Sequence, residues 1–192
     1  MLEPVTLSDG RVRLEPLSLE HVAALEAAAA DGELWKLVVT TVPAPGGMRA
    51  YVEKALAAHA AGDGLPFVVR DLGDGVIVGT TRYYEYAPDV PRVAIGSTWY
   101  AASRQHTHIN TAAKLLLIDH ALGALGCAAI AWHTDILNTR SQRAIERLGA
   151  TREGVLRAHR RRRDGTLRDT VCYSMLADEW PALRARLAAT QR

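Results

Sequence analysis

Apolar and polar positions alternate in several short runs and recur every three to four residues in longer ones, which indicates strands and helices in one chain. The run 11–15 alternates charged and apolar residues, as a half-buried strand does. Leu19, Val22 and Leu25 instead recur every three residues behind Ser18, a residue type that caps helices. Further helices are predicted at 48–61, 111–125 and 138–148, with a last one capped by Asp178. Further strands are predicted at 67–70, 76–86, 93–100, 127–134, 155–160 and 168–175.

Glycine and proline mark the connections between these elements. The stretch 43–47 is a loop by composition, and turn residues at 73–75 and 164–165 predict two hairpins. Hairpins combined with strand–helix–strand crossovers predict an α/β fold whose mixed sheet is covered by helices on both faces. Since no repeat, low-complexity tract or linker interrupts the pattern, we expect a single domain spanning 1–192.

Composition narrows the classes of protein and leaves the fold prediction unchanged. Hydrophobic residues make up 48% and charged residues 23%, which are globular values, and a net charge of +2 does not by itself indicate nucleic acid or membrane partners. Cys127 and Cys172 form no metal-binding motif and are typical of buried thiols, so no structural zinc is expected. The apolar window 115–132 contains Asp119 and His120 and is better explained by a helix and a strand. The prediction is a soluble cytoplasmic protein without a signal peptide or a metal.

The segment 94–125 contains the first candidate chemistry. Its pattern predicts a strand, a polar loop and a helix. In this arrangement the free backbone N–H groups and the positive end of the helix dipole are directed toward the loop at the N-terminus of the helix. Phosphate groups bind at such points. Ordinary capping of the helix by Asn110 or Thr111 explains the same residues, so the pattern alone leaves both interpretations open.

A second candidate is the pattern Asn138-x-x-Ser141-x-x-Ala144-Ile145-Glu146-x-x-Gly149. Asn138 is a good helix cap, and Ser141 and Glu146 are compatible with a solvated helix face. On its own, this pattern is therefore explained better by helix structure than by ligand binding.

Taken together, the segments resemble the Gcn5-related N-acetyltransferase (GNAT) superfamily, most closely its bacterial branch that includes the ribosomal-protein N-terminal acetyltransferases. The resemblance covers nearly the whole chain and is carried, in order, by Arg13-Leu14-Glu15-Pro16-Leu17, Tyr51-Val52-Glu53-x-Ala55-Leu56, Ile95-Gly96-x-Thr98-Trp99-Tyr100, Asn110-Thr111-x-Ala113-Lys114-Leu115-Leu116-Leu117, the 138–149 pattern, and Glu153-Gly154 with Arg168-Asp169-Thr170. It implies a mostly antiparallel mixed sheet that is splayed between the fourth and fifth strands.

The resemblance also implies a function. This is transfer of the acetyl group of acetyl-CoA to a primary amine, either a protein N-terminus or a small molecule, by direct attack. A non-catalytic acyl-CoA-binding or regulatory protein of the same fold is the alternative. The acceptor and the oligomeric state are not predicted, although a homodimer is compatible with the sequence.

Individual residues acquire roles through the same resemblance. Ser141 is implied as the proton donor to the leaving thiolate, and no metal is implied. The implied cofactor-binding residues are Thr98, Trp99, Tyr100, Gln105, His106, Thr107, His108, Ile109, Asn110, Thr111 and Asn138.

The chain departs from the family pattern at two positions. His108 stands where the phosphate loop of the family usually has glycine, and we expect its side chain to point outward so that the backbone N–H groups stay accessible. Ala94 stands where a glutamate is common, which leaves the general base open among Glu85, His133 and Asp135.

The hairpin at 157–168 contains four consecutive arginines, 160–163. They are explained by a solvated turn, by a docking surface for an acidic acceptor, or by RNA binding. The third interpretation is the weakest because no aromatic residue interleaves with the run, so no specific nucleic acid is expected. Tyr173 is compatible with an acceptor site or with the core. The acceptor pocket itself is expected to involve the loop 35–47 and the hairpin ends.

Overall fold

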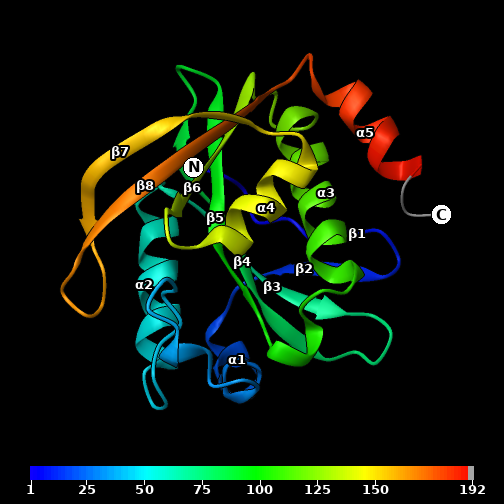
Figure 1. Ribbon diagram of the computed structural model, residues 1–192. Coiled ribbons are helices and arrows are strands. Elements are labelled where there is room, and N and C mark those ends of the chain that lie inside the picture. The colour runs from blue at the N-terminus through cyan, green and yellow to red at the C-terminus, as the bar shows by residue number, and fades with distance from the viewer. Residues whose placement is uncertain (190–192) are drawn as a thin grey trace.

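The computed structural model describes residues 1–189, in which one eight-stranded sheet carries helices on both faces (Figure 1). The sheet order is β1-β2-β3-β4-β5-β6-β8-β7, and every neighbouring pair is antiparallel except β5 and β6. The strands are β1 (Leu7–Ser8), β2 (Val12–Pro16), β3 (Gly64–Asp71), β4 (Ile77–Ala87), β5 (Arg92–Tyr100), β6 (Ala129–Asp135), β7 (Thr151–Arg161) and β8 (Leu167–Leu176). The helices are α1 (Val22–Ala30), α2 (Met48–Ala60), α3 (His108–Leu122), α4 (Thr139–Leu148) and α5 (Trp180–Ala189). The predicted α/β class and mixed sheet are confirmed.

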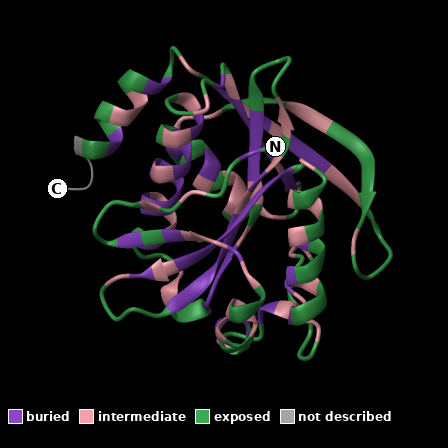
Figure 2. Ribbon diagram, turned by 180° about the vertical axis from the view of Figure 1, so that it is seen from behind, coloured by how far each residue is buried: buried purple, intermediate pink, exposed green. Residues whose placement is uncertain are grey.

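Alternation along the strands divides the core between two faces of the sheet. Phe67 packs into a core cluster with residues of α3, α4 and α5, whereas the next residue, Val68, packs into a second cluster with residues of α1 and α2. We call these the α3–α4 face and the α1–α2 face. Figure 2 shows the buried residues concentrated along the sheet between the two helix layers.

The sheet opens between β5 and β6, the fourth and fifth of the predicted strands. Only three residue pairs connect them, the last being Ala94 with Ala131. Beyond that pair, β5 continues to Tyr100 and β6 to Asp135 without pairing with each other. A register shift between β4 and β5 and a left-handed residue, Ser97 with φ +47°, mark a bulge that bends β5. The predicted splay is therefore confirmed.

Several predicted boundaries were wrong. The third main helix begins at His108 because Thr107 caps it, with Oγ1 accepting the N–H of Ile109 at 3.4 Å, so neither Asn110 nor Thr111 is the cap. It ends at Leu122, three residues before the prediction. Ser18 precedes a 3₁₀ turn and α1 itself begins at Val22.

The predicted strands at 155–160 and 168–175 were too short, and β1 was not predicted at all. Most of β7 is exposed on both sides, so it lacks the alternation that reveals a half-buried strand. In the described part of the chain, no helix is both long and apolar enough to span a membrane.

Candidate functional site

The loop between β5 and α3 is anchored on both sides by side-chain contacts. The hydroxyl of Ser103 donates to Asp31, just past the end of α1, at 2.5 Å. The guanidinium of Arg104 donates to Asp71 at 2.9 Å and forms an ion pair with Asp74. The Ser103 contact thus holds the loop against the end of α1, and the Arg104 contacts hold it against the β3–β4 end of the sheet.

The N-terminus of α3 remains open to an anion. His106 adopts a left-handed conformation, φ +62°, and its side chain, like that of His108, is exposed. The first turn of α3 contains no acidic residue. The first N–H groups of a helix have no acceptor within the helix, and here Thr107 Oγ1 accepts that of Ile109. This arrangement agrees with the expectation that both imidazoles point away from the backbone.

Three of the predicted cofactor residues have buried side chains. Trp99 lies on the α1–α2 face, where its Nε1 donates to the Tyr51 hydroxyl at 3.2 Å. Tyr100 and Ile109 belong to the core of the α3–α4 face. These three can meet a ligand only through their main chains. Asn110 and Thr111 are half-buried in the first turn of α3.

Gln105 spans the open end of the splay. Its side-chain amide donates to the carbonyl of Tyr100, the last residue of β5, at 2.9 Å. Its side-chain oxygen accepts a hydrogen bond from Arg140 in the first turn of α4. Gln105 therefore connects β5 and α4 and has a structural role that the sequence did not reveal.

A buried lysine lies under the splayed part of β5. Nζ of Lys114 donates to the hydroxyl of Thr98 at 2.6 Å and to that of Thr81 at 3.2 Å, and the two hydroxyls are 2.8 Å apart. Burial lowers the pKa of Lys114 to about 7. The hydrophobic pattern did not predict this buried amine, although the position of Lys114 between Ala113 and Leu115 in an apolar helix run was a signal.

Asn138 and Ser141 meet at the start of α4. The side-chain oxygen of Asn138 accepts the backbone N–H of Ser141 at 3.1 Å, so Asn138 is the helix cap. Within the described residues, the side-chain nitrogen of Asn138 and the hydroxyl of Ser141 have no protein partner. Capping therefore leaves one polar group on each side chain available for a ligand.

On the α1–α2 face, the Tyr84 ring reaches across β5. A methyl group placed at Gly96 would lie 2.7 Å from the Tyr84 ring, so only glycine accommodates the ring there. The Tyr84 hydroxyl lies 3.1 Å from Nδ1 of His133 on β6, and a Glu85 carboxylate oxygen lies 3.7 Å from the same nitrogen. Burial, the largest effect, lowers the pKa of His133 and raises that of Tyr84. These side chains connect β4 with β6 across β5, the strand that separates from β6 beyond Ala94.

Asp135, the third candidate base, is committed to another partner. Its two oxygens accept from Arg162 at 2.6 and 2.9 Å, and its side chain is 1% exposed. Burial opposes ionisation, but hydrogen bonds from Arg162 and from the Leu137 backbone leave the pKa of Asp135 lowered. This carboxylate is thus a buried structural anion.

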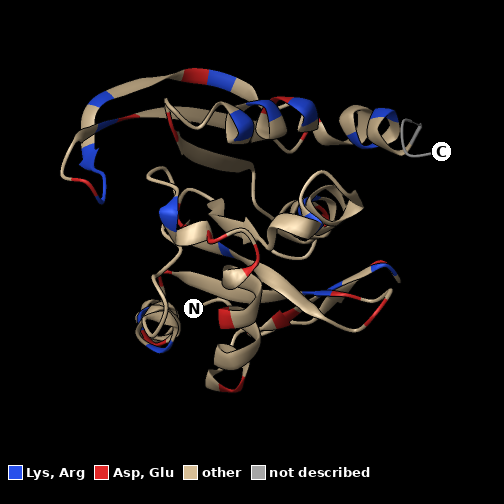
Figure 3. Ribbon diagram, turned by 60° about the horizontal axis from the view of Figure 1, so that its bottom comes forward, with Lys and Arg blue, Asp and Glu red and all other residues tan. Residues whose placement is uncertain are grey.

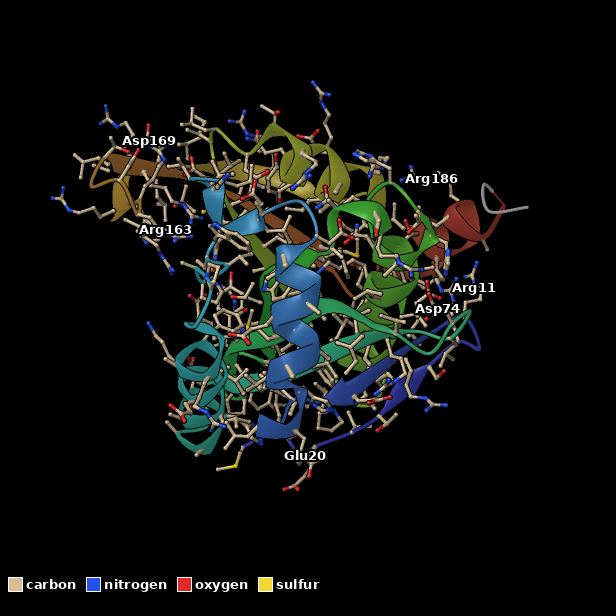
Figure 4. The ribbon with its side chains drawn as sticks, turned by 90° about the horizontal axis from the view of Figure 1, so that it is seen from below. Arg11, Glu20, Asp74, Arg163, Asp169 and Arg186 are labelled. Atoms are coloured by element: carbon tan, nitrogen blue, oxygen red, sulfur yellow. The ribbon has the colours of Figure 1, made fainter. Side chains whose placement is uncertain are left out.

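The arginine run is not a free patch of four charges. Figure 3 shows basic residues at the turn of the β7–β8 hairpin, and Figure 4 shows Arg163 on that hairpin. Arg163 donates to the carbonyls of Trp35 at 3.0 Å and Val42 at 2.7 Å, which clamps the hairpin to the loop before α2. Together with the buried Arg162–Asp135 pair, this contact excludes an entirely solvated turn.

Tyr173 is a core residue. It is 1% exposed on the α3–α4 face, and its hydroxyl donates to Glu146 of α4 at 2.8 Å. Its pairing with Trp132 directs it away from the face that carries His133. Tyr173 therefore does not line the α1–α2 face.

A family model described as an acetyltransferase (GNAT) domain matches residues 11–151. The chain belongs to the GNAT acetyltransferase family. A candidate acetyltransferase from T. thermophilus is 34% identical, with all of both chains covered and a TM-score of 0.87. A GCN5-related N-acetyltransferase from Brucella melitensis is 29% identical, with 98% of this chain and 86% of that chain covered and a TM-score of 0.87.

Mycobacterium smegmatis RimJ, solved in complex with CoA-disulfide, is 25% identical, with 97% of this chain and 95% of that chain covered and a TM-score of 0.81. The search of curated proteins gave no significant match. The resemblance to the GNAT superfamily and to its ribosomal-protein branch is thus confirmed, and this GNAT protein is an N-acetyltransferase enzyme.

Proposed function

We propose that this enzyme binds acetyl-CoA at the opening between β5 and β6 and transfers the acetyl group to a primary amine that approaches from the α1–α2 face. The observation that carries the proposal is the splay itself. Beyond Ala94, β5 has an unpaired edge beside β6, and the open N-terminus of α3 follows β5 directly. The CoA-bound RimJ structure, which has the same fold, supports this ligand class.

The residues present fit such a ligand. The main chain at 98–100 offers hydrogen-bonding groups for an amide-containing arm, and the N–H groups at 106–111, in the preceding loop and the first turn of α3, suit a pyrophosphate. The free side-chain nitrogen of Asn138 lies at the start of α4, which Gln105 links to the end of β5. Acetyl-CoA would supply the acetyl group as a reactive thioester.

Among the three candidate bases, the contacts favour His133. The Glu85 carboxylate near Nδ1 favours the tautomer with hydrogen on Nδ1, which donates to the Tyr84 oxygen and leaves Nε2 with a free lone pair. Burial lowers the pKa of His133, so the ring is neutral at pH 7 and can accept a proton from an amine. Glu85 raises that pKa, whereas Arg160, Arg92 and His159 lower it further.

Ser141 is the proposed proton donor to the departing thiolate. Its hydroxyl has no protein partner in the described residues and lies in the first turn of α4, beside Asn138. A serine hydroxyl at that point can stabilise developing negative charge on sulfur by donating a hydrogen bond.

Calorimetry with CoA tests the binding site. The variant His108→Asp adds a negative charge at the first residue of α3 and should weaken CoA binding at least about tenfold by repulsion of the pyrophosphate. Ala182→Asp adds the same charge in the first turn of α5 and should leave CoA affinity unchanged. Absence of CoA binding by the parent chain at millimolar concentration would contradict the proposal.

A pH profile tests the assignment of the base. If His133 accepts the proton, kcat/KM rises as the ring loses its proton and levels off above a pKa lower than 6.5, the usual histidine value. His133→Gln should abolish that limb and lower kcat by about 10²-fold, with CoA affinity retained. An unchanged profile in His133→Gln would remove the residue from the mechanism.

A further inference from the structure

Two arginines face each other across the β7–β8 hairpin, next to the residues that connect β4 with β6. Arg160 on β7 pairs in register with Arg168 on β8. Like charges directly opposite on neighbouring strands destabilise a sheet unless an anion offsets them. Arg160 has one, since its guanidinium lies 3.8 Å from a Glu85 oxygen.

Arg168 has no such partner. Among residues 1–189 no carboxylate forms an ion pair with it, and its buried Nε has no hydrogen-bond acceptor. Burial lowers the pKa of Arg168, and the neighbouring Arg160 and Arg162 lower it further, against an opposing effect of Asp135. An unsatisfied, partly buried guanidinium is costly in a folded protein, which points to a ligand that completes it.

The nearby carboxylates are already engaged. Asp135 accepts two hydrogen bonds from Arg162, and Glu85 lies near both Arg160 and His133. Asp135 and Glu85 thus contact Arg162 and Arg160, the charges of Asp164 and Asp169 also act on Arg162, and Arg168 is left without a carboxylate contact.

Register places Arg168 on the face of the proposed base. His133 pairs with Cys172, and side chains alternate along β8, so Arg168 projects from the same face as Cys172 and His133. Burial and Glu85 raise the pKa of the Tyr84 hydroxyl, which contacts His133, and Arg160 and Arg168 act in the opposite direction. Arg168 therefore lies on the same face as His133, four residues along β8 from the residue that pairs with it.

We propose that the acceptor carries a carboxylate near its amine, and that Arg168 and Arg160 bind this carboxylate while the amine lies toward His133. The guanidinium fork matches a carboxylate with two parallel hydrogen bonds, which a lone amine or an uncharged amide cannot provide. This inference rests on the proposed function, because it concerns the acceptor for the same acetyl transfer.

Two pairs of amines distinguish an acceptor with a side-chain carboxylate from an acceptor with an α-carboxylate. The tripeptide amides Ser-Asp-Ala and Ser-Asn-Ala differ only by a side-chain carboxylate, whereas serine and serinamide differ by the α-carboxylate. We expect kcat/KM to be at least about tenfold higher for the acidic member of one pair. Equal values within both pairs would overturn the proposal.

Variants then identify the residue that recognises the carboxylate. Arg168→Gln should remove the preference by raising KM for the acidic member, with CoA affinity unchanged. Arg157→Gln removes the same charge from an exposed position of β7 and should retain the preference. A preference that survives Arg168→Gln would overturn the assignment.

If the enzyme acetylates none of these four amines, binding of product analogues tests the same proposal. N-acetylserine and N-acetylserinamide are titrated into the CoA-bound enzyme by calorimetry. Tighter binding of the acid that is lost in Arg168→Gln supports the proposal, and equal binding of acid and amide overturns it. CoA binding is measured first in the same instrument, so failure of the proposed function is seen separately as absence of that signal.

Discussion

Lys114 should make the stability of this enzyme increase with pH in a range where most side chains do not titrate. Its amine is buried against Thr81 and Thr98, and burial lowers its pKa from 10.5 to about 7. Between these two values the unfolded chain binds a proton that the folded chain has lost. The free energy of unfolding therefore increases as the pH rises from about 7 to 10.5, and it levels off below 7, where the folded chain also holds the proton, and above 10.5, where both states have lost it.

The sign and size of the effect follow from the two pKa values. Between these pKa values the unfolded state binds more protons than the folded state, so the free energy of unfolding increases with pH. The physical reason is that a buried amine is less costly in its neutral form, which alkaline solution favours. Between pH 7 and pH 9 the free energy of unfolding should increase by about 2 kcal/mol from this group alone. Lys114→Met removes the titrating amine and leaves Thr81 and Thr98, whose hydroxyls lie 2.8 Å apart, bonded to each other. The variant should lose this increase and unfold with a flatter dependence on pH.

Urea denaturation at pH 7, 8 and 9 and constant ionic strength measures the free energy of unfolding. The difference between parent and Lys114→Met isolates the lysine, since other groups contribute equally to both curves. Lys54→Met, at an exposed position of α2, is the matched control and should follow the parent. Parallel curves for parent and Lys114→Met would refute the reasoning, because they would show that the amine is not desolvated in the fold.

Three further predictions concern the site and a fourth concerns a buried ion pair. Ser141→Ala should lower kcat by about 10²-fold with CoA binding retained by calorimetry, and normal turnover would exclude its role as proton donor. Asn138→Ala should lower the free energy of unfolding by about 1 kcal/mol through loss of the α4 cap, and it should weaken CoA binding as well if the side-chain nitrogen holds the cofactor. His106→Gly should raise the melting temperature, since relief of a left-handed residue stabilises by about 1 kcal/mol, and a lower melting temperature would show that the imidazole makes a stabilising contact. For the buried pair, Asp135→Asn should destabilise the fold by about 3 kcal/mol or more in denaturant titrations by leaving Arg162 unpaired, whereas a loss below about 1 kcal/mol would contradict its burial.

The sequence by itself determined the features that depend on neighbours along the chain. The order of helices and strands followed from hydrophobic period and turn residues. Asn138 caps α4 and Gly149 ends it at φ +96°, as their types and spacing predict. The splay between β5 and β6 came from the family resemblance, because no local pattern specifies where two strands part.

The tertiary structure alone decided which distant side chains meet. Tyr84 and His133 are 49 residues apart, and Arg163 reaches the Trp35 carbonyl across 128 residues. A pattern of polar and apolar positions assigns a residue to a face, but strand register and bulges decide its partner on that face. For this reason the sequence could not choose among three candidate bases, and could not show that Lys114 is buried or that Arg168 lacks a partner. Those properties arise only when the sheet brings separate strands together and excludes water from between them.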